Sequence, residues 1–126
     1  IWIYEKYDGR FIGQYNGLPF CLMKVKGRKT GNLITIALLT IPHGDDYILV
    51  ASQGGAKTNP LWYYNLKENP EIEMQVFSDI FKMRAIELSN DEKNELWPTI
   101  IEAYPGYENY QKVTNRNIPV FICKRI

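Results

Sequence analysis

The chain has 126 residues, of which 45% are hydrophobic, 23% charged and 13% aromatic. This length suits one domain, and this composition is typical of a globular protein, so it excludes a disordered chain. The net charge of only +1 argues against general nucleic-acid binding, because that function needs a broad basic face.

The first predicted element is a short N-terminal helix, followed by a loop that ends at Gly17. Apolar residues between Ile1 and Tyr15 recur at helical spacing, and the pair Asp8-Gly9 interrupts the pattern. We expect this segment to belong to the same domain as the rest of the chain.

Two strands joined by a hairpin turn are predicted next, over residues 18–25 and 33–41. Both are apolar on their two alternating faces, as expected for strands that are covered on each side. The segment Gly27–Asn32 forms the turn between them. A second turn, in the letters PHGDD, leads into a third strand, YILVAS.

The letters TNPLWYYNLKENP predict a helix with Asn59 as its N-cap and Pro60 at its first helical position, ending near Pro70. A further strand pair follows, EIEMQVF and IFKMRAIEL, with its turn around Ser78 and Asp79.

A capping box, in which Glu92 answers Ser89, opens the next predicted helix. A short tyrosine-bearing helix and the strand IPVFICK complete the chain. Five or six strands, mostly in meander order with helices inserted late, predict an antiparallel barrel of the α+β class. We expect residues 18–126 to form this barrel, with residues 1–17 as part of the same domain.

The charges are unevenly distributed along the chain. Between Gly9 and Gly44 there is no acidic residue, and four of the five cations in that stretch lie in the hairpin at Lys24, Lys26, Arg28 and Lys29. One interpretation is a solvated turn that keeps an apolar hairpin from associating. The other is a local site for a small anion.

A second anion-binding spot is predicted in the letters ASQGGAKTNP. Gly54 and Gly55 follow a strand and precede a helix, so the backbone can approach a ligand closely, and Lys57 adds a cation. The alternative is a plain turn. The glycine spacing does not match a dinucleotide-binding fingerprint.

Cys21 and Cys123 lie far apart in apolar runs, which predicts buried, reduced thiols and a reducing compartment. His43 is the sole histidine. We therefore expect neither a metal site nor a serine triad.

Three separated blocks, GRKTG, ASQGGAKTNPLWYYNLKENPEIEMQV and ELWPTIIEAYPGYENYQKVTNRNIPV, resemble the deazaflavin-dependent nitroreductase and quinone reductase family. The resemblance covers roughly residues 18 to 124. It implies a split antiparallel β-barrel, the FMN-binding type of fold that is similar to pyridoxamine-phosphate oxidases. It also implies the deazaflavin coenzyme F-420, whose tail carries a phosphate and several glutamates.

By this resemblance, the hairpin binds the anionic tail, because a phosphate and carboxylates accept charge-assisted hydrogen bonds. The expected cofactor-binding residues are Lys24, Lys26, Arg28, Lys29, Thr30, Ser52, Gln53, Gly54, Gly55, Ala56, Lys57, Trp62 and Tyr104. FMN is the alternative cofactor, because Ile34 and Gln53 stand where the family often has basic residues. Leu39 stands where nitroreductase members often have tyrosine.

Tyr104, Tyr107 and Tyr110 recur at a spacing of three around Pro105 and Gly106, which favours one shared face if the later segment is helical. The resemblance places this cluster over the substrate side of the cofactor, although packing is the alternative role for Tyr104 and Trp62. The implied reaction is hydride transfer to an apolar quinone, enone or nitroaromatic. Tyr107 is the first candidate for the catalytic hydrogen-bond or proton donor, and Tyr110 the second.

Alternative functions are an FMN-dependent oxidoreductase of the same fold, a non-catalytic deazaflavin-binding protein and a carrier of apolar ligands. The expected partner is an apolar electron acceptor, and the protein is expected to be a monomer or homodimer. We expect a cytoplasmic location, since no apolar run approaches a membrane span. Peripheral membrane contact through a segment upstream of Ile1 is left open.

Overall fold

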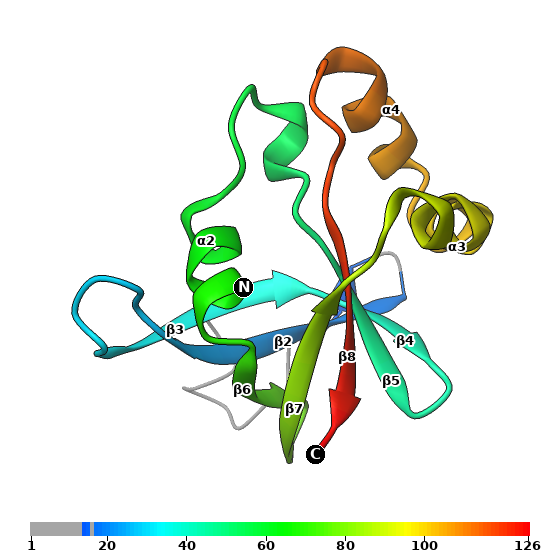
Figure 1. Ribbon diagram of the computed structural model, residues 1–126. Helices are drawn as coiled ribbons and strands as arrows, with labels where there is room; N and C mark the ends of the chain where they lie inside the picture. The colour runs from blue at the N-terminus through cyan, green and yellow to red at the C-terminus, as the bar shows by residue number, and fades with distance from the viewer. Residues whose placement is uncertain (1–13, 16) are drawn as a thin grey trace.

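The computed structural model describes residues 14–15 and 17–126 (Figure 1). The predicted N-terminal helix lies outside the described residues, except that Gln14–Tyr15 is a short strand, β1. The other elements are β2 (Leu18–Lys26), β3 (Leu33–Leu39), β4 (Ile41–His43), β5 (Asp46–Val50), the 3₁₀ turn η1 (Gln53–Gly55), α2 (Leu61–Glu68), β6 (Glu71–Val76), β7 (Asp79–Glu87), α3 (Asn90–Ala103), α4 (Gly106–Val113) and β8 (Val120–Arg125).

The strands form one eight-stranded sheet in the order β1-β2-β6-β7-β8-β5-β4, with β3 also paired to β2. Every pair is antiparallel. This curled antiparallel sheet with separate helices confirms the predicted α+β class and split barrel. The strands outnumber the predicted five or six, because β1 and β4 are too short to show an apolar pattern.

The single strand predicted over residues 33–41 is wrong at Thr40. The chain bends there, so that β3 pairs with β2 and β4 pairs with β5 at the other end of the sheet. Thr40 is fully buried; its amide donates to the Pro19 carbonyl at 2.9 Å and its hydroxyl to the Ile48 carbonyl at 3.0 Å. These bonds hold the corner that curls the sheet.

The prediction that this strand is covered on both faces is also wrong. Leu33 and Ile34, at the start of β3, are 66% and 39% exposed. Among the described strands β3 pairs only with β2, so it forms an edge of the sheet. By contrast, β5 is covered on both faces, since Leu49 packs in one buried cluster and Ile48 in another.

The local helix signals are confirmed with one exception. The Ser89 hydroxyl accepts from the Glu92 amide at 3.2 Å and the Glu92 carboxylate accepts from the Ser89 amide at 2.9 Å, as the capping box predicts. The predicted N-cap of α2 is wrong by one residue. Pro60 takes that place, with ψ of 155°, because the Asn59 side chain is bound by Arg116 instead.

The core consists of two clusters that meet along β5 and β8. The inner cluster fills the curl of the sheet beneath α2, with Met23, Met74 and Phe121 among its members. Cys21 and Cys123 also belong to it as buried free thiols, as predicted. Burial raises the pKa of the Cys21 thiol to about 12, which makes it unreactive at neutral pH.

The outer cluster lies between the sheet and the pair α3 and α4, and its centre is formed by Ile48, Ile100 and Ile118. In Figure 1, α2 stands beside the β2–β3 hairpin, whereas α3 and α4 lie together on the far side of the segment that leads into β8. The starts of α2 and α4 both contribute residues to one cavity, through Trp62 and Tyr107.

Candidate active site

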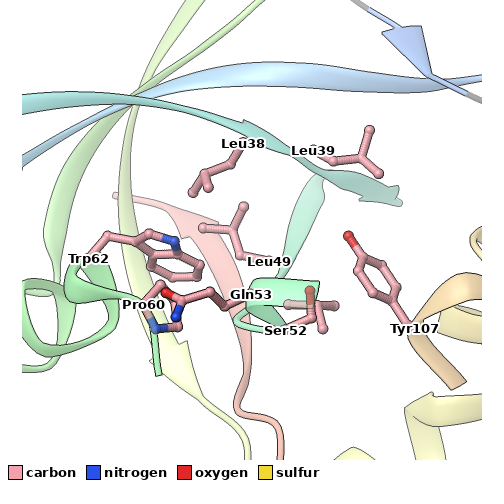
Figure 2. Close-up of a pocket in the computed structure, with 9 residues that line it drawn as sticks. Leu38, Leu39, Leu49, Ser52, Gln53, Pro60, Trp62 and Tyr107 are labelled. Carbon is pink, nitrogen blue, oxygen red and sulfur yellow. The ribbon is translucent and has the colours of Figure 1, made fainter. Parts of the chain in front are cut away.

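A cavity of about 230 Å³ lies where the two core clusters meet (Figure 2). Its walls come from β3, β5, the loop after β5, and the starts of α2 and α4. The residues that line it are Leu38, Leu39, Leu49, Val50, Ser52, Gln53, Pro60, Trp62 and Tyr107. Most of this surface is apolar, and the polar groups come from Ser52, Gln53 and Tyr107.

Trp62 and Tyr107 stand on opposite sides of the cavity, with Leu49 between them (Figure 2). Trp62 is 8% exposed and its ring lies 6.2 Å from that of Phe121 in a tilted arrangement. The two roles weighed for Trp62, packing and ligand contact, are therefore compatible, because one face of its ring packs in the core while another lines the cavity.

Tyr107 has a buried ring and an available hydroxyl. The residue is 5% exposed, and its hydroxyl forms no hydrogen bond within the described part of the chain. Among the described residues, every fully buried side-chain oxygen or nitrogen has a hydrogen-bond partner. The unbonded Tyr107 hydroxyl is therefore not fully buried, and it faces the open space of the cavity (Figure 2). Burial, and to a lesser degree the nearby Tyr104 and Tyr110 hydroxyls, raises the pKa of Tyr107.

The three tyrosines cluster, but not on one helix face. Tyr104 is the C-cap of α3 in an extended conformation, and only Tyr107 and Tyr110 lie on α4. The Tyr104 ring lies 4.6 Å from the Tyr107 ring and 6.3 Å from the Tyr110 ring. The Tyr104 and Tyr110 hydroxyls are 3.3 Å apart and hydrogen bond to each other. Neither residue lines the cavity. The structure therefore places Tyr107 at the cavity and the other two behind it, as its support.

The loop from Ser52 to Lys57 has an unusual backbone. Gln53, Gly54 and Gly55 have successive positive φ values of 45°, 63° and 80°, a conformation that glycine adopts readily and glutamine adopts at a cost. A Cβ atom on Gly55 would lie 2.5 Å from Val113 Cγ2 and 2.9 Å from the Tyr110 carbonyl oxygen. A Cβ atom on Gly54 would meet nothing within 4 Å.

The two glycines thus have different roles. Gly55 allows the loop to pack closely against α4 of its own chain, and its contact with a ligand stays a prediction. Gly54 is open and remains available for close approach by a ligand. Ala56 and Lys57 follow it but do not line the cavity.

The hairpin is tied to α2 through Arg28. The Arg28 amide donates to Asn65 Oδ1 at 3.0 Å, its Nη1 donates to the same oxygen at 3.3 Å, and its guanidinium lies 5.3 Å from the centre of the Tyr64 ring. Lys29 and Thr30 are exposed, and the Thr30 hydroxyl accepts from the Asn32 amide at 3.2 Å. Arg28 therefore presents its cation beside α2, and Lys29 is the next residue of the same exposed turn.

Lys24 and Lys26 are not brought to this place. On β2 they alternate with Met23 and Val25, which pack in the inner cluster beneath α2. Successive side chains of a strand point to opposite faces, so the two lysines point away from the inner cluster. Lys26 lines a surface hollow with Glu68 and Asn69, at the C-terminal end of α2 and away from Arg28. Lys24 Nζ lies 3.5 Å from a Glu73 carboxylate oxygen. The geometry divides the four predicted hairpin cations into two pairs.

Three polar residues at the site were missed by the sequence analysis. Asn65 binds Arg28, Arg116 binds the loop after β5, and Lys93 is buried beside α4. Lys93 Nζ donates to Gln111 Oε1 at 2.8 Å and Asn117 Oδ1 at 2.7 Å. Single polar residues inside helices and loops give no pattern that distinguishes them from surface residues.

Comparison with known proteins gives the family of the chain. The family described as F420H(2)-dependent quinone reductase matches residues 1–125. The F420H(2)-dependent quinone reductase Rv1261c of Mycobacterium tuberculosis is 35% identical over 127 residues, which cover 98% of this chain and 85% of that protein. The cofactor in these names is the predicted deazaflavin.

Two similar solved structures have TM-scores of 0.77. One, described as an F420-H2 dependent reductase, is 36% identical and covers 84% of this chain and 94% of its own. The other, described as a domain-swapped dimer, is 34% identical and covers 98% of this chain and 97% of its own.

A pyridoxamine 5'-phosphate oxidase-type structure from Listeria innocua, with a TM-score of 0.56 and 9% identity over 84% of this chain and 82% of that one, shares the fold alone. This likeness agrees with the predicted type of split barrel. The family match over nearly the whole chain, together with the 35% identity to Rv1261c, gives the assignment. The chain belongs to the F420H(2)-dependent quinone reductase family.

Proposed function

We propose that this protein reduces quinones with F420H2, and that the acceptor binds in the cavity between Trp62 and Tyr107. The observation that carries the proposal is the Tyr107 hydroxyl, which is surrounded by buried groups and faces an apolar cavity without a partner among the described residues. Such a donor stabilises negative charge on a ligand oxygen better than water does, because the surrounding medium is apolar.

The residues present fit the deazaflavin cofactor. A cavity of about 230 Å³ is small for a whole cofactor, since drug-sized ligands fill about 300–1,000 Å³. The tail must therefore lie outside the cavity. Trp62 lines the cavity and Asn65, three residues further along α2, holds Arg28, so the hairpin cations lie about one helical turn away.

Arg28 and Lys29 would hold the phosphate and carboxylates of the tail, and the open backbone at Gly54 would lie against the cofactor. Ser52, Gln53 and Trp62 would contact its ring system. When bound, reduced F420 supplies a hydride, which is the chemistry that the family names describe.

Tyr107 acts as a hydrogen-bond donor and keeps its own proton. Its raised pKa makes it a weak acid, so the hydroxyl remains neutral throughout the physiological pH range. It donates to the acceptor oxygen as negative charge develops there, and the proton that completes the hydroquinone comes from solvent. The apolar side chains of Leu38, Leu39 and Leu49 exclude water from the reacting carbon.

Enones and nitroaromatics are proposed as further acceptors, because both also develop charge on an oxygen that one hydroxyl can stabilise. Leu39 faces Tyr107 across the cavity mouth (Figure 2) and leaves that side apolar, which favours a quinone with an apolar substituent. We expect FMN to bind more weakly than F420, since the hairpin suits a longer anionic tail.

Of the two predicted oligomeric states, we favour the homodimer, because one related structure is described as a domain-swapped dimer. Sedimentation velocity tests this choice. Within residues 14–15 and 17–126, no helix is long and apolar enough to cross a bilayer. A cytoplasmic location, with or without membrane contact upstream of Ile1, stays a prediction.

Tyr107→Phe tests the proposed reaction. With F420H2 and a menadione-like quinone we expect turnover to fall roughly a hundredfold, about 3 kcal/mol. F420 affinity, measured by fluorescence titration alongside FMN, and the melting temperature should change little. Tyr47→Phe is the matched control, because Tyr47 packs against Phe81 at 6.0 Å and does not line the cavity.

Full turnover with a lowered melting temperature would return Tyr107 to a packing role. Failure of the wild-type protein to bind F420 would contradict the proposed function itself, and tight FMN binding would then favour the FMN-dependent alternative.

A further inference from the structure

Arg116 binds the loop after β5 with almost its whole guanidinium group. Its Nε donates to the Ala56 carbonyl at 2.8 Å and its Nη2 to the Ser52 carbonyl at 2.6 Å. Its Nη1 donates to the Ala51 carbonyl at 3.1 Å and to Asn59 Oδ1 at 2.7 Å. Four of the five N–H donors of an arginine are therefore used on one nine-residue segment.

The charge of Arg116 is not balanced by an acidic side chain. No ion pair joins it to a carboxylate within the part of the chain that the structure describes. Burial lowers the pKa of Arg116, although an arginine stays charged in proteins. A partly buried cation that binds only neutral acceptors is stabilised by the dipoles of those acceptors. The guanidinium of Arg116 therefore keeps its position only while the carbonyl groups of the loop point toward it.

The loop needs such a support, because its backbone is strained. Gln53 has a φ of 45°, which a residue with a side chain keeps only when the surroundings hold it. The other backbone bonds of this turn are local, from the Gly55 amide to the Ser52 carbonyl at 2.9 Å and from the Ala56 amide to the Gln53 carbonyl at 3.1 Å. Arg116 supplies most of the bonds that come from elsewhere in the fold. The Thr114 hydroxyl also donates to the Ala56 carbonyl at 3.4 Å, and the Ala51 amide donates to the Pro119 carbonyl at 2.9 Å.

Arg116 also connects the two walls of the cavity. Ser52 and Gln53 line one wall and Tyr107 lines the other. Arg116 follows α4, the helix that carries Tyr107, and its carbonyl accepts from Gln111 Nε2 of that helix at 2.8 Å. Arg116 therefore ties the loop to the segment that follows α4, in addition to the packing of Gly55 against that helix.

We propose that Arg116 is a positioning residue, which sets the shape of the 51–59 loop and, with it, the fit of the deazaflavin ring against Ser52 and Gln53. The second half of this statement rests on the proposed function. The first half, the shape of the loop, does not, and can be tested on the protein without cofactor.

Hydrogen exchange of the apo protein tests the loop. In Arg116→Met we expect the amides of Gly55 and Ala56 to exchange at least about tenfold faster than in the wild type, because local opening becomes easier. Amides of the β6–β7 ladder should be unchanged. In Arg116→Lys, which keeps the charge but has no planar fork, exchange should be intermediate.

Steady-state kinetics tests the link to the cofactor. For Arg116→Met we expect KM for F420H2 to rise about tenfold or more, with a smaller change in kcat at saturating cofactor, and Arg116→Lys should restore part of the loss. Arg125→Met is the matched control, because that exposed arginine lies over Phe81 at 4.2 Å, away from the cavity. Its KM should equal that of the wild type.

The outcomes separate the two proposals. Faster exchange in a protein that fails to bind F420 supports the loop-shaping role and contradicts the proposed function. Unchanged exchange and an unchanged KM in Arg116→Met overturn the inference, as does a loss of activity that only follows a lowered melting temperature. If Arg116→Met does not fold, hydrogen exchange and the KM for F420H2 are measured on Arg116→Lys and Asn59→Ala instead. Unchanged exchange and an unchanged KM in these variants would likewise overturn the inference.

Discussion

The β2–β3 hairpin and the loop after β5 both approach α2, but they are held in different ways. The hairpin, Gly27–Asn32, is rich in charge and largely exposed, and it is closed by its own bond from the Gly27 amide to the Asn32 carbonyl at 2.8 Å. The loop carries one cation, Lys57, and four of its hydrogen-bond acceptors are bound by Arg116.

This difference separates two tasks. The hairpin offers mobile positive charge, which suits an extended, anionic ligand tail. The loop offers a fixed backbone shape, which suits a rigid ring. Clustered charge in a sequence therefore indicates where an anion can bind. The shape of the adjoining cavity depends instead on residues that are distant in the sequence.

The largest effect is expected for Gly55→Ala, which disturbs the packing of the loop after β5 against α4. The new methyl group would meet Val113 and the Tyr110 carbonyl oxygen, at a φ of 80°. Strain of about 1–2 kcal/mol and overpacking of about 1–3 kcal/mol should lower the free energy of unfolding by about 2–5 kcal/mol. Urea unfolding measures this change.

Gly54→Ala is the control for that prediction. This variant has the same kind of backbone strain, with a φ of 63°, but the new Cβ atom has no neighbour within 4 Å. Its free energy of unfolding should therefore fall by only about 1–2 kcal/mol. Equal losses for both variants would mean that contact with α4 does not matter.

Lys93 is connected to the loop after β5 indirectly, through Gln111 and Arg116, and a smaller effect is expected when its charge changes. Its ammonium group binds Gln111, which binds the carbonyl of Arg116, and it lies 4.8 Å from the centre of the Trp97 ring. Burial, with a smaller contribution from the charge of Arg116, lowers the pKa of Lys93 from 10.5 to about 8. No carboxylate pairs with Lys93 in the described part of the chain.

The sign of the pH effect follows from proton uptake. Between pH 8 and 10.5 the unfolded chain keeps the Lys93 proton and the folded protein has lost it, so this residue makes stability rise with pH in that window. Below pH 8 both states are protonated, and the cost of the buried charge is constant. The total rise should be at most about 3 kcal/mol.

Urea unfolding of the wild type and of Lys93→Met, from pH 7 to 10.5, isolates this contribution as the difference between two curves. We expect the wild type to gain stability relative to the variant as the pH rises. Parallel curves would show that the Lys93 proton is not lost in this range.

The smallest effect is expected on the hairpin side. Arg28→Ala with Lys29→Ala should weaken F420 binding by about 2 kcal/mol, roughly thirtyfold in Kd, because charge-assisted bonds at exposed positions are partly screened. The fold should stay intact, since the Arg28 amide keeps its bond to Asn65. Fluorescence titration at two salt concentrations measures the loss.

Lys24→Ala with Lys26→Ala is the matched control for the hairpin. It removes the same charge from the opposite face of β2, so F420 affinity should be nearly unchanged. Equal losses from both double variants would mean that the ligand responds to net charge and not to the position of the cations beside α2.

Much of the fold was predicted because its signals are local. The hairpin at Gly27–Asn32, the capping box of α3, the pairing of β6 with β7 and the tyrosine-bearing α4 all depend on residues a few positions apart. The bend at Thr40 was missed because a threonine in an apolar run looks like any strand residue. Its two buried hydrogen bonds exist only once β2 and β5 are in place.

The candidate site was predicted in part. Tyr107, Trp62, Ser52 and Gln53 line the cavity, and Arg28 lies beside α2, where its contact with the cofactor tail stays a prediction. Lys24 and Lys26 lie on the face of β2 opposite to Met23 and Val25, which the charged run alone does not indicate. Gly55 lies against α4, and a sequence cannot tell which surface a glycine approaches. The ligand contacts of all three residues stay predictions.

By itself, the sequence determined the local elements, the class of fold and the family, because caps, turns and apolar alternation act over a few residues and three motif blocks recur together. Only the tertiary structure decided which residues meet at the cavity. Asn65 binds Arg28 across 37 positions, and Arg116 binds Asn59 and Ala51 across 57 and 65 positions. Such contacts depend on how the sheet curls around Thr40 and where α4 packs on it, and these are properties of the whole chain that no local pattern encodes.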